Sequence, residues 1–229
     1  MKISGLQKLT LLDFPGKTAC TVFTSGCNFR CPFCHNSILI PFENESLISE
    51  DEFFAFLAKR HRLLDGVCIT GGEPLFQKDI ADFCRRIKDE GFLVKLDTNG
   101  SLPERLSYLI ENRLIDYVAM DLKNSKEKYA ETIGVEDFDI SPIEKSVEIL
   151  MKSDIPYEFR TTVVREYHDR ESLLSAAKWI KGARAYYLQA FKDSENVIEK
   201  NLTSFEKGEL EAFKSEIAQF VENTEIRGL

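Results

Sequence analysis

The alternation of short apolar runs with amphipathic segments most constrains the fold of this 229-residue chain. Six runs rich in apolar and β-branched residues have the length and composition of buried strands, and a segment with helical periodicity follows each one. The expected strands are residues 18–24, 66–70, 92–96, 115–122, 157–164 and 185–188. The expected helices are residues 50–63, 78–90, 103–112, 141–153, 170–181 and 205–222.

Such alternation predicts parallel strands joined by right-handed crossovers, with helices on both faces of the sheet. A complete barrel of eight such units takes about 250 residues, so six units predict an incomplete one. We therefore expect an α/β fold, an incomplete (β/α)6 barrel, in a single domain over residues 1–229. The expected parts are an N-terminal lead-in (residues 1–17), the (β/α) core (residues 18–190) and a C-terminal helical segment (residues 191–229).

Local signals support several of these boundaries. Ser49 and Glu52 have the spacing of a capping box, which predicts a helix start at residue 50. Gly91 follows the second expected helix and is expected to be its C-cap. The polar stretch 123–139 carries no strong periodicity and is expected to be a loop.

Three cysteines follow the first expected strand, at Cys27, Cys31 and Cys34. The thiolates of this C-x3-C-x2-C loop can converge on one metal centre, because a turn containing Pro32 brings nearby sulfurs together. Three ligands leave one corner of a four-iron cluster open for chemistry, whereas a structural zinc ion takes four ligands. A zinc site with a remote fourth ligand and a disulfide with one leftover thiol are the alternatives.

The other three cysteines, Cys20, Cys68 and Cys84, lie singly in apolar patterns and are expected to be small buried side chains. Six cysteines with three of them clustered fit a reducing compartment better than a disulfide framework. No apolar run approaches the roughly 18 residues that a membrane span needs, and the N-terminus lacks a signal-peptide core, so a cytoplasmic location without membrane contact is expected.

The net charge is −8, from 30 basic and 38 acidic residues. A general nucleic-acid binder needs basic groups to displace counterions from phosphates, so nucleic acid is not expected as a partner. We interpret the acidity mainly as an ordinary aid to solubility.

The cysteine loop resembles the cluster loop of the radical S-adenosylmethionine (SAM) enzymes, C-x3-C-x-aromatic-C, with Phe33 as the aromatic residue. Cys34-His35-Asn36, preceded by Asp13-Phe14-Pro15-Gly16, resembles the glycyl-radical-enzyme activating proteins, especially activators of anaerobic ribonucleoside-triphosphate reductase and of pyruvate formate-lyase. The resemblance implies a (β/α)6 fold of the radical SAM type, with a 4Fe-4S cluster on Cys27, Cys31 and Cys34 and SAM at the open iron.

The resemblance also implies the reaction. Reductive cleavage of SAM gives methionine and a 5′-deoxyadenosyl radical, which removes a hydrogen atom from a glycine of a partner enzyme. The favoured partner is anaerobic ribonucleoside-triphosphate reductase, and flavodoxin or ferredoxin is the implied electron donor. The alternatives are a pyruvate formate-lyase-type activase, a radical SAM enzyme acting on a small molecule such as a pterin-derived ring, and a non-catalytic zinc-binding module.

Gly71, Gly72 and Glu73 follow the second expected strand and match the Gly-Gly-Glu motif of the family. Glycines allow a backbone to approach a ligand without a clash at Cβ, and Glu73 can accept hydrogen bonds from the ammonium of SAM. A plain turn between strand and helix is the alternative for this segment.

Asp97, Thr98 and Asn99 end the third expected strand, and Asp121 and Lys123 end the fourth, at places where the glycyl-radical activators carry similar motifs. Carboxylates at neighbouring strand ends repel each other unless a cation or a donor lies between them. The resemblance therefore suggests that Asp97, Thr98 and Asp121 hold a monovalent cation or the ribose hydroxyls, and that Lys123 pairs with the SAM carboxylate. A turn at Asn99 and a cap-like role for Asp121 are the alternatives.

The same site has three further candidate residues, which are Arg160, Phe33 and His35. Arg160 either points into the barrel toward the SAM carboxylate or lies on the surface of an edge strand. Phe33 packs over the cluster or the adenine, or only in the core, and His35 is expected to contact the cofactor through its backbone. His168 is expected to lie in a polar loop, and His61 at an exposed helix end. Neither histidine is expected to have a role in the site. No catalytic residue is expected beyond the cluster and SAM.

Overall fold

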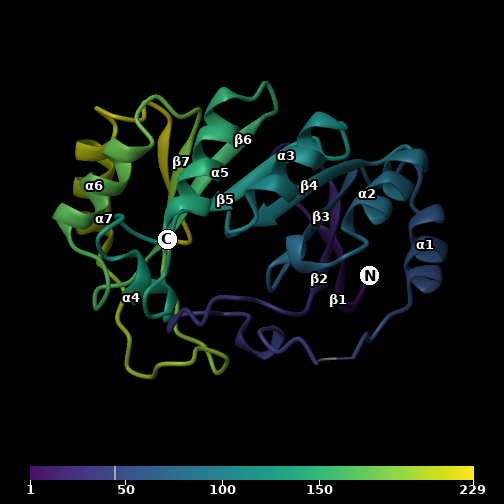
Figure 1. Cartoon of the computed structure of the whole chain (residues 1–229), viewed down its shortest axis with the longest axis horizontal. Helices are drawn as coiled ribbons and strands as arrows, with labels where there is room; N and C mark the ends of the chain where they lie inside the picture. Colours follow the sequence, from purple (N-terminus) through teal and green to yellow (C-terminus); the bar gives the residue numbers. More distant parts are fainter. Residues whose placement is uncertain (44) are drawn as a thin grey trace. The chain divides into compact units, whose positions relative to one another are not determined.

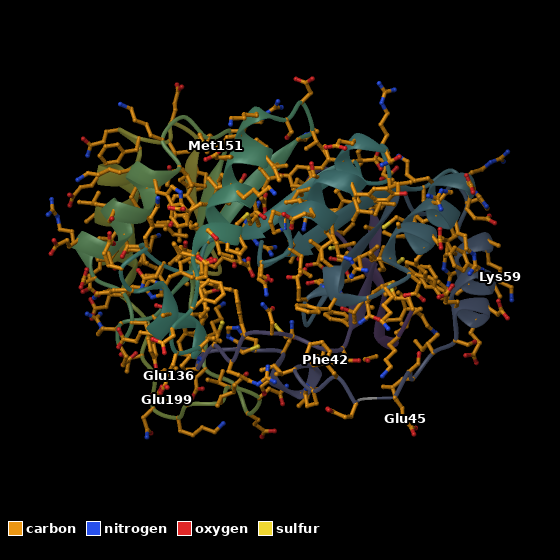
Figure 2. All side chains as sticks on the ribbon, viewed as in Figure 1. Phe42, Glu45, Lys59, Glu136, Met151 and Glu199 are labelled. Atoms are coloured by element: carbon orange, nitrogen blue, oxygen red, sulfur yellow. The ribbon has the colours of Figure 1, made fainter. Side chains whose placement is uncertain are left out.

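The computed structural model describes residues 1–43 and 45–229, which form two compact units (Figure 1). The first unit comprises Met1–Asn28, Ile38–Thr98 and Leu102–Val118, and the second comprises Phe29–Ser37, Asn99–Ser101 and Ala119–Leu229. Charged side chains such as Lys59 and Glu199 are exposed at the surface (Figure 2). Among the described residues, no helix is both long and apolar enough to cross a membrane. The single-domain organisation stays a prediction.

The first unit carries four strands that pair in sequence order. They are β1 (Ile3–Thr10), β2 (Ala19–Thr24), β3 (Gly66–Gly71) and β4 (Leu93–Thr98). The pairs β2–β3 and β3–β4 are parallel, as predicted from the alternation. The first strand was predicted at residues 18–24, but β1 precedes it within the expected lead-in and pairs with β2 in antiparallel fashion.

The helices of the first unit follow its strands closely. They are α1 (Glu50–Ala58), α2 (Ile80–Asp89) and α3 (Pro103–Glu111), with a short 3-10 helix, η2 (Pro74–Phe76), after β3. The predicted capping box of Ser49 and Glu52 is present. Helix α1 ends before the expected residue 63, because the chain turns after Ala58 and Arg62 adopts a positive φ of 70°. The predicted apolar face of α2 is buried, including Phe83 and Ile87.

The second unit contains three strands that pair in parallel. They are β6 (Tyr157–Val163), β7 (Tyr186–Ala190) and β8 (Thr224–Arg227). Strand β5 (Tyr117–Asp121) begins in the first unit and ends in the second. The helices are α4 (Tyr129–Ile133), α5 (Ser141–Lys152), α6 (Arg170–Trp179) and α7 (Lys207–Ile217).

Two expectations for the second unit are wrong. Residues 123–139 are not only a loop, because α4 forms there and ends at Gly134, whose left-handed conformation makes it a C-cap. Residues 191–229 are not only helical, because α7 ends at Ile217 and β8 follows it. Strand β8 has four residues, too few to show a clear alternation of apolar and polar side chains.

Candidate active site

In the first unit, the glycines after β3 allow the backbone to pack against itself. A Cβ on Gly71 would lie 2.3 Å from the carbonyl oxygen of Thr24, and Gly71 has a φ of +116°. A Cβ on Gly72 would lie 2.3 Å from the carbonyl oxygen of Gly26. The amide of Gly72 donates to Thr24 O at 2.9 Å. These glycines therefore fix the end of β3 against the start of the cysteine loop, and their approach to SAM stays a prediction.

Glu73 is fully buried and joins the end of β3 to the end of β4. Its Oε1 accepts hydrogen bonds from Thr98 Oγ1 at 2.8 Å and from the Leu75 amide at 3.0 Å, which caps η2. The backbone amide of Glu73 donates to Gly26 O at 2.8 Å. Two predicted site residues, Glu73 and Thr98, are thus brought together, and a bond from Glu73 to the SAM ammonium stays a prediction.

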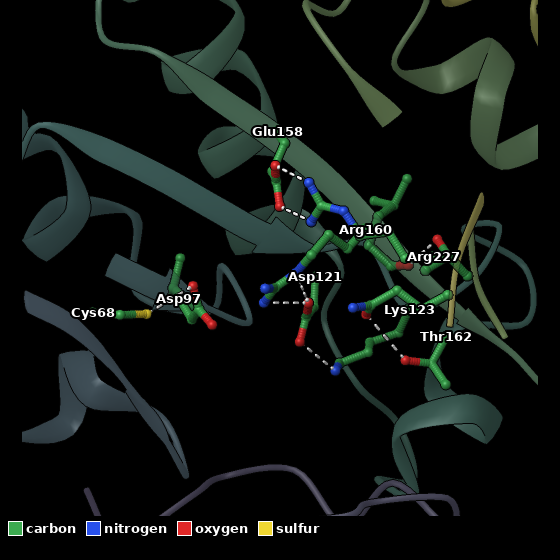
Figure 3. Close-up of polar contacts among 12 residues, drawn as sticks. Cys68, Asp97, Asp121, Lys123, Glu158, Arg160, Thr162 and Arg227 are labelled. Atoms are coloured by element: carbon green, nitrogen blue, oxygen red, sulfur yellow. Dashed lines mark hydrogen bonds and ion pairs between the residues drawn. The ribbon is translucent and has the colours of Figure 1, made fainter. Parts of the chain in front are cut away.

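Asp97 has an internal counter-charge that the sequence reasoning missed. Lys95 lies two residues earlier on β4, is 1% exposed, and forms an ion pair with Asp97. The thiol of Cys68 on β3 lies 3.8 Å from Asp97 Oδ1 (Figure 3). It also lies 3.8 Å from Lys95 Nζ. The available signal was the two-residue spacing, because residues i and i+2 of a strand point to the same face.

The cysteine loop is held by backbone hydrogen bonds in both units. In the first unit, the amide of the half-buried Cys27 donates to Ile40 O at 3.0 Å. In the second, the amide of Cys34 donates to Cys31 O at 3.0 Å, so these two cysteines lie on one turn. All six cysteines lie in the described part of the chain and none forms a disulfide, which contradicts the disulfide alternative.

Asp121, at the end of β5, is held by two cations of the second unit (Figure 3). Its Oδ1 accepts a hydrogen bond from Arg160 Nε at 2.9 Å, and its Oδ2 accepts one from Lys123 Nζ at 2.9 Å. Burial alone would raise the pKa of Asp121, but the charges of Arg160 and Lys123 outweigh it and lower the pKa to about 2. Arg160 is 12% exposed at its side chain, so the surface alternative for this residue is wrong.

Lys123 also connects this ion-pair network to the cysteines. Burial opposes its charge, but the negative charges of Asp121, Cys31 and Cys34 raise the pKa of Lys123. Burial raises the pKa of the Cys34 thiol, and Lys123 partly offsets that effect. A metal binds thiolates, so a cation beside Cys31 and Cys34 suits a soft-metal ligand set. Among the described residues, no cluster of three or more His, Cys, Asp or Glu is already arranged around an ion position, so the three-cysteine set rests on spacing and chemistry.

Phe33 and His168 pack together in the second unit. Phe33 is 3% exposed, and its ring centroid lies 5.7 Å from that of Tyr167 and 6.0 Å from that of His168. His168 is 2% exposed, and its Nε2 lies 2.8 Å from Lys123 O. Burial lowers the pKa of His168. His168 lies in the loop between β6 and α6, as predicted, but it is buried there and supports both Phe33 and the Lys123 backbone.

The segment after β7, residues 191–199, runs along the cysteine loop within the second unit. The His35 imidazole packs against the Phe191 ring at a tilt of 35°, with centroids 5.5 Å apart, and its Nε2 lies 2.7 Å from Lys192 O. Ser37 Oγ donates to Asn196 O, and the Glu199 amide donates to Pro32 O at 3.0 Å. We call residues 191–199 the post-β7 segment. The His35 side chain therefore has a structural partner, and its backbone contact with a cofactor stays a prediction.

The remaining predicted residues have ordinary structural surroundings. Asn99 Oδ1 accepts hydrogen bonds from the Ser101 amide at 2.9 Å and from Ser101 Oγ at 2.7 Å, so the predicted turn is present. A direct role of Asn99 in binding stays a prediction. Cys20 and Cys84 are fully buried, as expected, and burial raises the pKa of each thiol to about 12.

Comparisons with known proteins agree with these features. The family model of the Radical SAM superfamily matches residues 21–180. A Methanocaldococcus jannaschii protein, provisionally named a glycyl-radical enzyme activating enzyme, is 35% identical over 98% of this chain and 95% of its own length. A Campylobacter jejuni GTP 3′,8-cyclase is 27% identical over 71% of this chain, but the match spans only 51% of that protein.

Solved structures show the same fold. A domain of the pyruvate-formate lyase-activating enzyme from Bacteroides vulgatus has a TM-score of 0.57 at 17% identity, covering 71% of this chain and 99% of that one. SuiB from Streptococcus suis, solved with SAM bound, has a TM-score of 0.69 at 14% identity, covering 90% of this chain and 49% of that one. These similarities confirm the predicted α/β fold.

Proposed function

Because this chain belongs to the radical SAM superfamily, we propose that it is an activase that removes a hydrogen atom from a glycine of a partner enzyme. Enzymes of this family use a 4Fe-4S cluster and SAM. The observation that carries the activase assignment is the 35% identity, over nearly the full length of both chains, to the Methanocaldococcus jannaschii protein provisionally named a glycyl-radical enzyme activating enzyme. A non-catalytic zinc-binding module is inconsistent with this family membership.

The residues of the chain have distinct roles in this proposal. When bound, the reduced cluster supplies the electron that cleaves SAM. Cys27, Cys31 and Cys34 would hold the cluster as thiolates, and the Lys123 ammonium stabilises negative charge at Cys31 and Cys34. Arg160 fixes Asp121, which in turn fixes Lys123, so that the ammonium keeps one position. Burial of these groups strengthens their mutual attraction, because water screens them less.

Other predicted ligands complete the site in this proposal. Gly71, Gly72 and Glu73 would contact the amino group of SAM, Thr98 and Asn99 would lie near its ribose, and Phe33 and His35 would flank the cluster. The burial of Glu73 and Thr98 and their mutual hydrogen bond support a rigid position for both. A rigid position reduces the ordering cost of binding a ligand.

We favour anaerobic ribonucleoside-triphosphate reductase as the partner, with a pyruvate formate-lyase-type enzyme as the alternative. This preference rests on the resemblance carried by Asp13-Phe14-Pro15-Gly16. Flavodoxin or ferredoxin as the electron donor and a cytoplasmic location remain predictions.

Electron paramagnetic resonance tests the proposal directly. The cluster-loaded protein is incubated anaerobically with SAM, a reductant and either a purified anaerobic reductase or a pyruvate formate-lyase from the same source. We expect a glycyl doublet on the correct partner, and none when its radical glycine is replaced by alanine. A chain that cleaves SAM but yields no doublet on either class of partner would not be an activase of these enzymes.

A small-molecule substrate is the second candidate, because the chain also matches part of the GTP 3′,8-cyclases. Its marker is formation of 5′-deoxyadenosine that depends on added GTP and requires no partner protein. The match spans about half of the cyclase, so the rest of that enzyme has no counterpart in the aligned region.

A further inference from the structure

Lys95 is a buried ammonium that the proposed mechanism does not use. Its side chain lies on β4, which pairs in parallel with β3, and is 2% exposed. Removing a charge from water is unfavourable unless an opposite charge and hydrogen bonds replace the lost hydration. In this unit, the carboxylate that forms an ion pair with Lys95 is Asp97.

A lysine ammonium resembles a small monovalent cation in the contacts that it offers. It carries one positive charge on a compact group with three donors, and it reaches Asp97 from within the same strand. Na⁺ or K⁺ at Asp97 would lie close to the Lys95 ammonium, which already contacts Oδ1 of that carboxylate. The two cations would also repel each other in surroundings that water screens poorly.

The second carboxylate named for a cation site is also neutralised from within the chain. In the second unit, Asp121 accepts hydrogen bonds from Arg160 on Oδ1 and from Lys123 on Oδ2, each at 2.9 Å. Both of its oxygens therefore already contact a positive group. The residues present do not fit the monovalent cation that the resemblance suggests for Asp97 and Asp121.

We propose that Lys95 takes the place of that cation, so that the chain binds SAM without a requirement for Na⁺ or K⁺. Lys95 is then a positioning residue, which acts by holding Asp97 in place. This inference rests on the proposed use of SAM. Its first test does not depend on that use.

The first test compares thermal unfolding of the apo chain under argon in KCl, NaCl and choline chloride at equal ionic strength. A cation that binds only the folded state raises the midpoint, because it adds RT ln(1 + [cation]/Kd) to the free energy of unfolding, whereas choline is too large for a carboxylate site. We expect equal midpoints for the wild type. The Lys95→Met variant should unfold at lower temperature in choline chloride and recover part of that loss in KCl.

Two further variants make the cation effect specific. Lys95→Met combined with Asp97→Asn should show no recovery in KCl, because the carboxylate that would bind the cation is gone. Lys152→Met removes a lysine whose side chain is 77% exposed, and it should behave as the wild type in all three salts. A wild-type midpoint that rises in KCl or NaCl over choline chloride would overturn the inference, even if Lys95→Met fails to fold.

The second test measures SAM binding to the cluster-loaded protein by isothermal titration in the same salts. The wild type should show one Kd in all of them, and Lys95→Met should bind at least about tenfold more weakly in choline chloride, with recovery in KCl. Wild-type affinity that requires KCl or NaCl contradicts the inference. Failure of the proposed function would be recognised separately. It would show as a missing glycyl doublet, and the unfolding midpoints in the three salts do not depend on that result.

Discussion

Cys31 is expected to be essential for cluster binding. It is buried, it lies on one turn with Cys34, and it is near the charge of Lys123. We predict that Cys31→Ala abolishes assembly of the 4Fe-4S cluster after anaerobic reconstitution with iron and sulfide. Absorbance near the thiolate-to-iron charge-transfer bands and electron paramagnetic resonance measure the loss.

Cys84→Ala is the matched control for this prediction. Cys84 is also buried, but it lies on the apolar face of α2. The control variant should lose some stability and keep the full cluster signal. An intact cluster in Cys31→Ala would remove Cys31 from the ligand set.

His168 should make the stability of the fold depend on pH. Burial lowers its pKa in the folded state, whereas in the unfolded chain the pKa returns to about 6.5. Unfolding therefore takes up a proton below that value, so stability is complete above about pH 6.5 and falls as the pH decreases. The limiting slope for one proton is about 1.4 kcal/mol per pH unit.

Urea unfolding of His168→Gln between pH 7.5 and 5 checks this prediction, with the wild type measured in parallel. The variant should be less stable at pH 7.5 and should lose stability less steeply as the pH falls. His61→Gln is the control, since the His61 side chain is 52% exposed. If the two variants have the same pH dependence, burial of His168 does not contribute to it.

Single residues differ in how far the sequence predicted them. The cysteine ligands could be predicted because their spacing is local, and Cys20 and Cys84 because they lie in apolar patterns. Lys95 and His168 could not, since each is buried by elements far away in the sequence. For Lys95, the two-residue spacing from Asp97 was a local sign that both side chains share a face of the strand, but no local sign showed that this face is buried.

The connection after β3 depends on glycine at Gly71. Its positive φ and the 2.3 Å approach of a built Cβ to Thr24 O leave no room for a side chain. We predict that Gly71→Ala destabilises the fold by about 3 kcal/mol, because the backbone must shift. Urea unfolding measures the change.

Gly208 provides the contrasting substitution. It lies in α7, and a Cβ built on it has no heavy atom within 4 Å. Gly208→Ala should therefore stabilise the chain, by about 0.5 kcal/mol from helix propensity. Equal effects of the two substitutions would show that the close contact at Gly71 carries no energetic cost.

The missed elements have a common physical reason. Strand β1 pairs with β2 through two register shifts, so its side chains do not alternate regularly between buried and exposed. Strand β8 and helix α4 are too short for their periodicity to stand out. The longer helices α2 and α5 were predicted well, because each repeats its apolar face over several turns.

Across the whole molecule, the order of strands and helices was predictable because it follows from local periodicity. Pairings between distant segments were not. Glu158 and Arg227 are an example, since they are 69 residues apart and form two hydrogen bonds, of 2.6 and 2.9 Å. Glu158 is fully buried, and Arg227 also stacks on the Tyr187 ring at 3.4 Å.

This ion pair links β8 to β6 within the second unit. We predict that Arg227→Met destabilises the chain by about 3 kcal/mol, because a buried carboxylate then lacks its counter-charge. Adding Glu158→Gln should recover part of the loss in urea unfolding. Arg170→Met, which breaks an ion pair between side chains that are 65% and 33% exposed, should cost less than about 1 kcal/mol.

The post-β7 segment links the cysteine loop to the surface of the protein. It is tied to the cysteine loop through the His35 imidazole, the Ser37 hydroxyl and the Pro32 carbonyl. We therefore expect that ordering of that loop on metal loading also restrains Lys192, Asn196 and Glu199, whose side chains are exposed. Trypsin cleavage after Lys192 should therefore be slower when the cysteines bind a metal centre than when they do not. Gel electrophoresis of the digest would then report whether metal is bound.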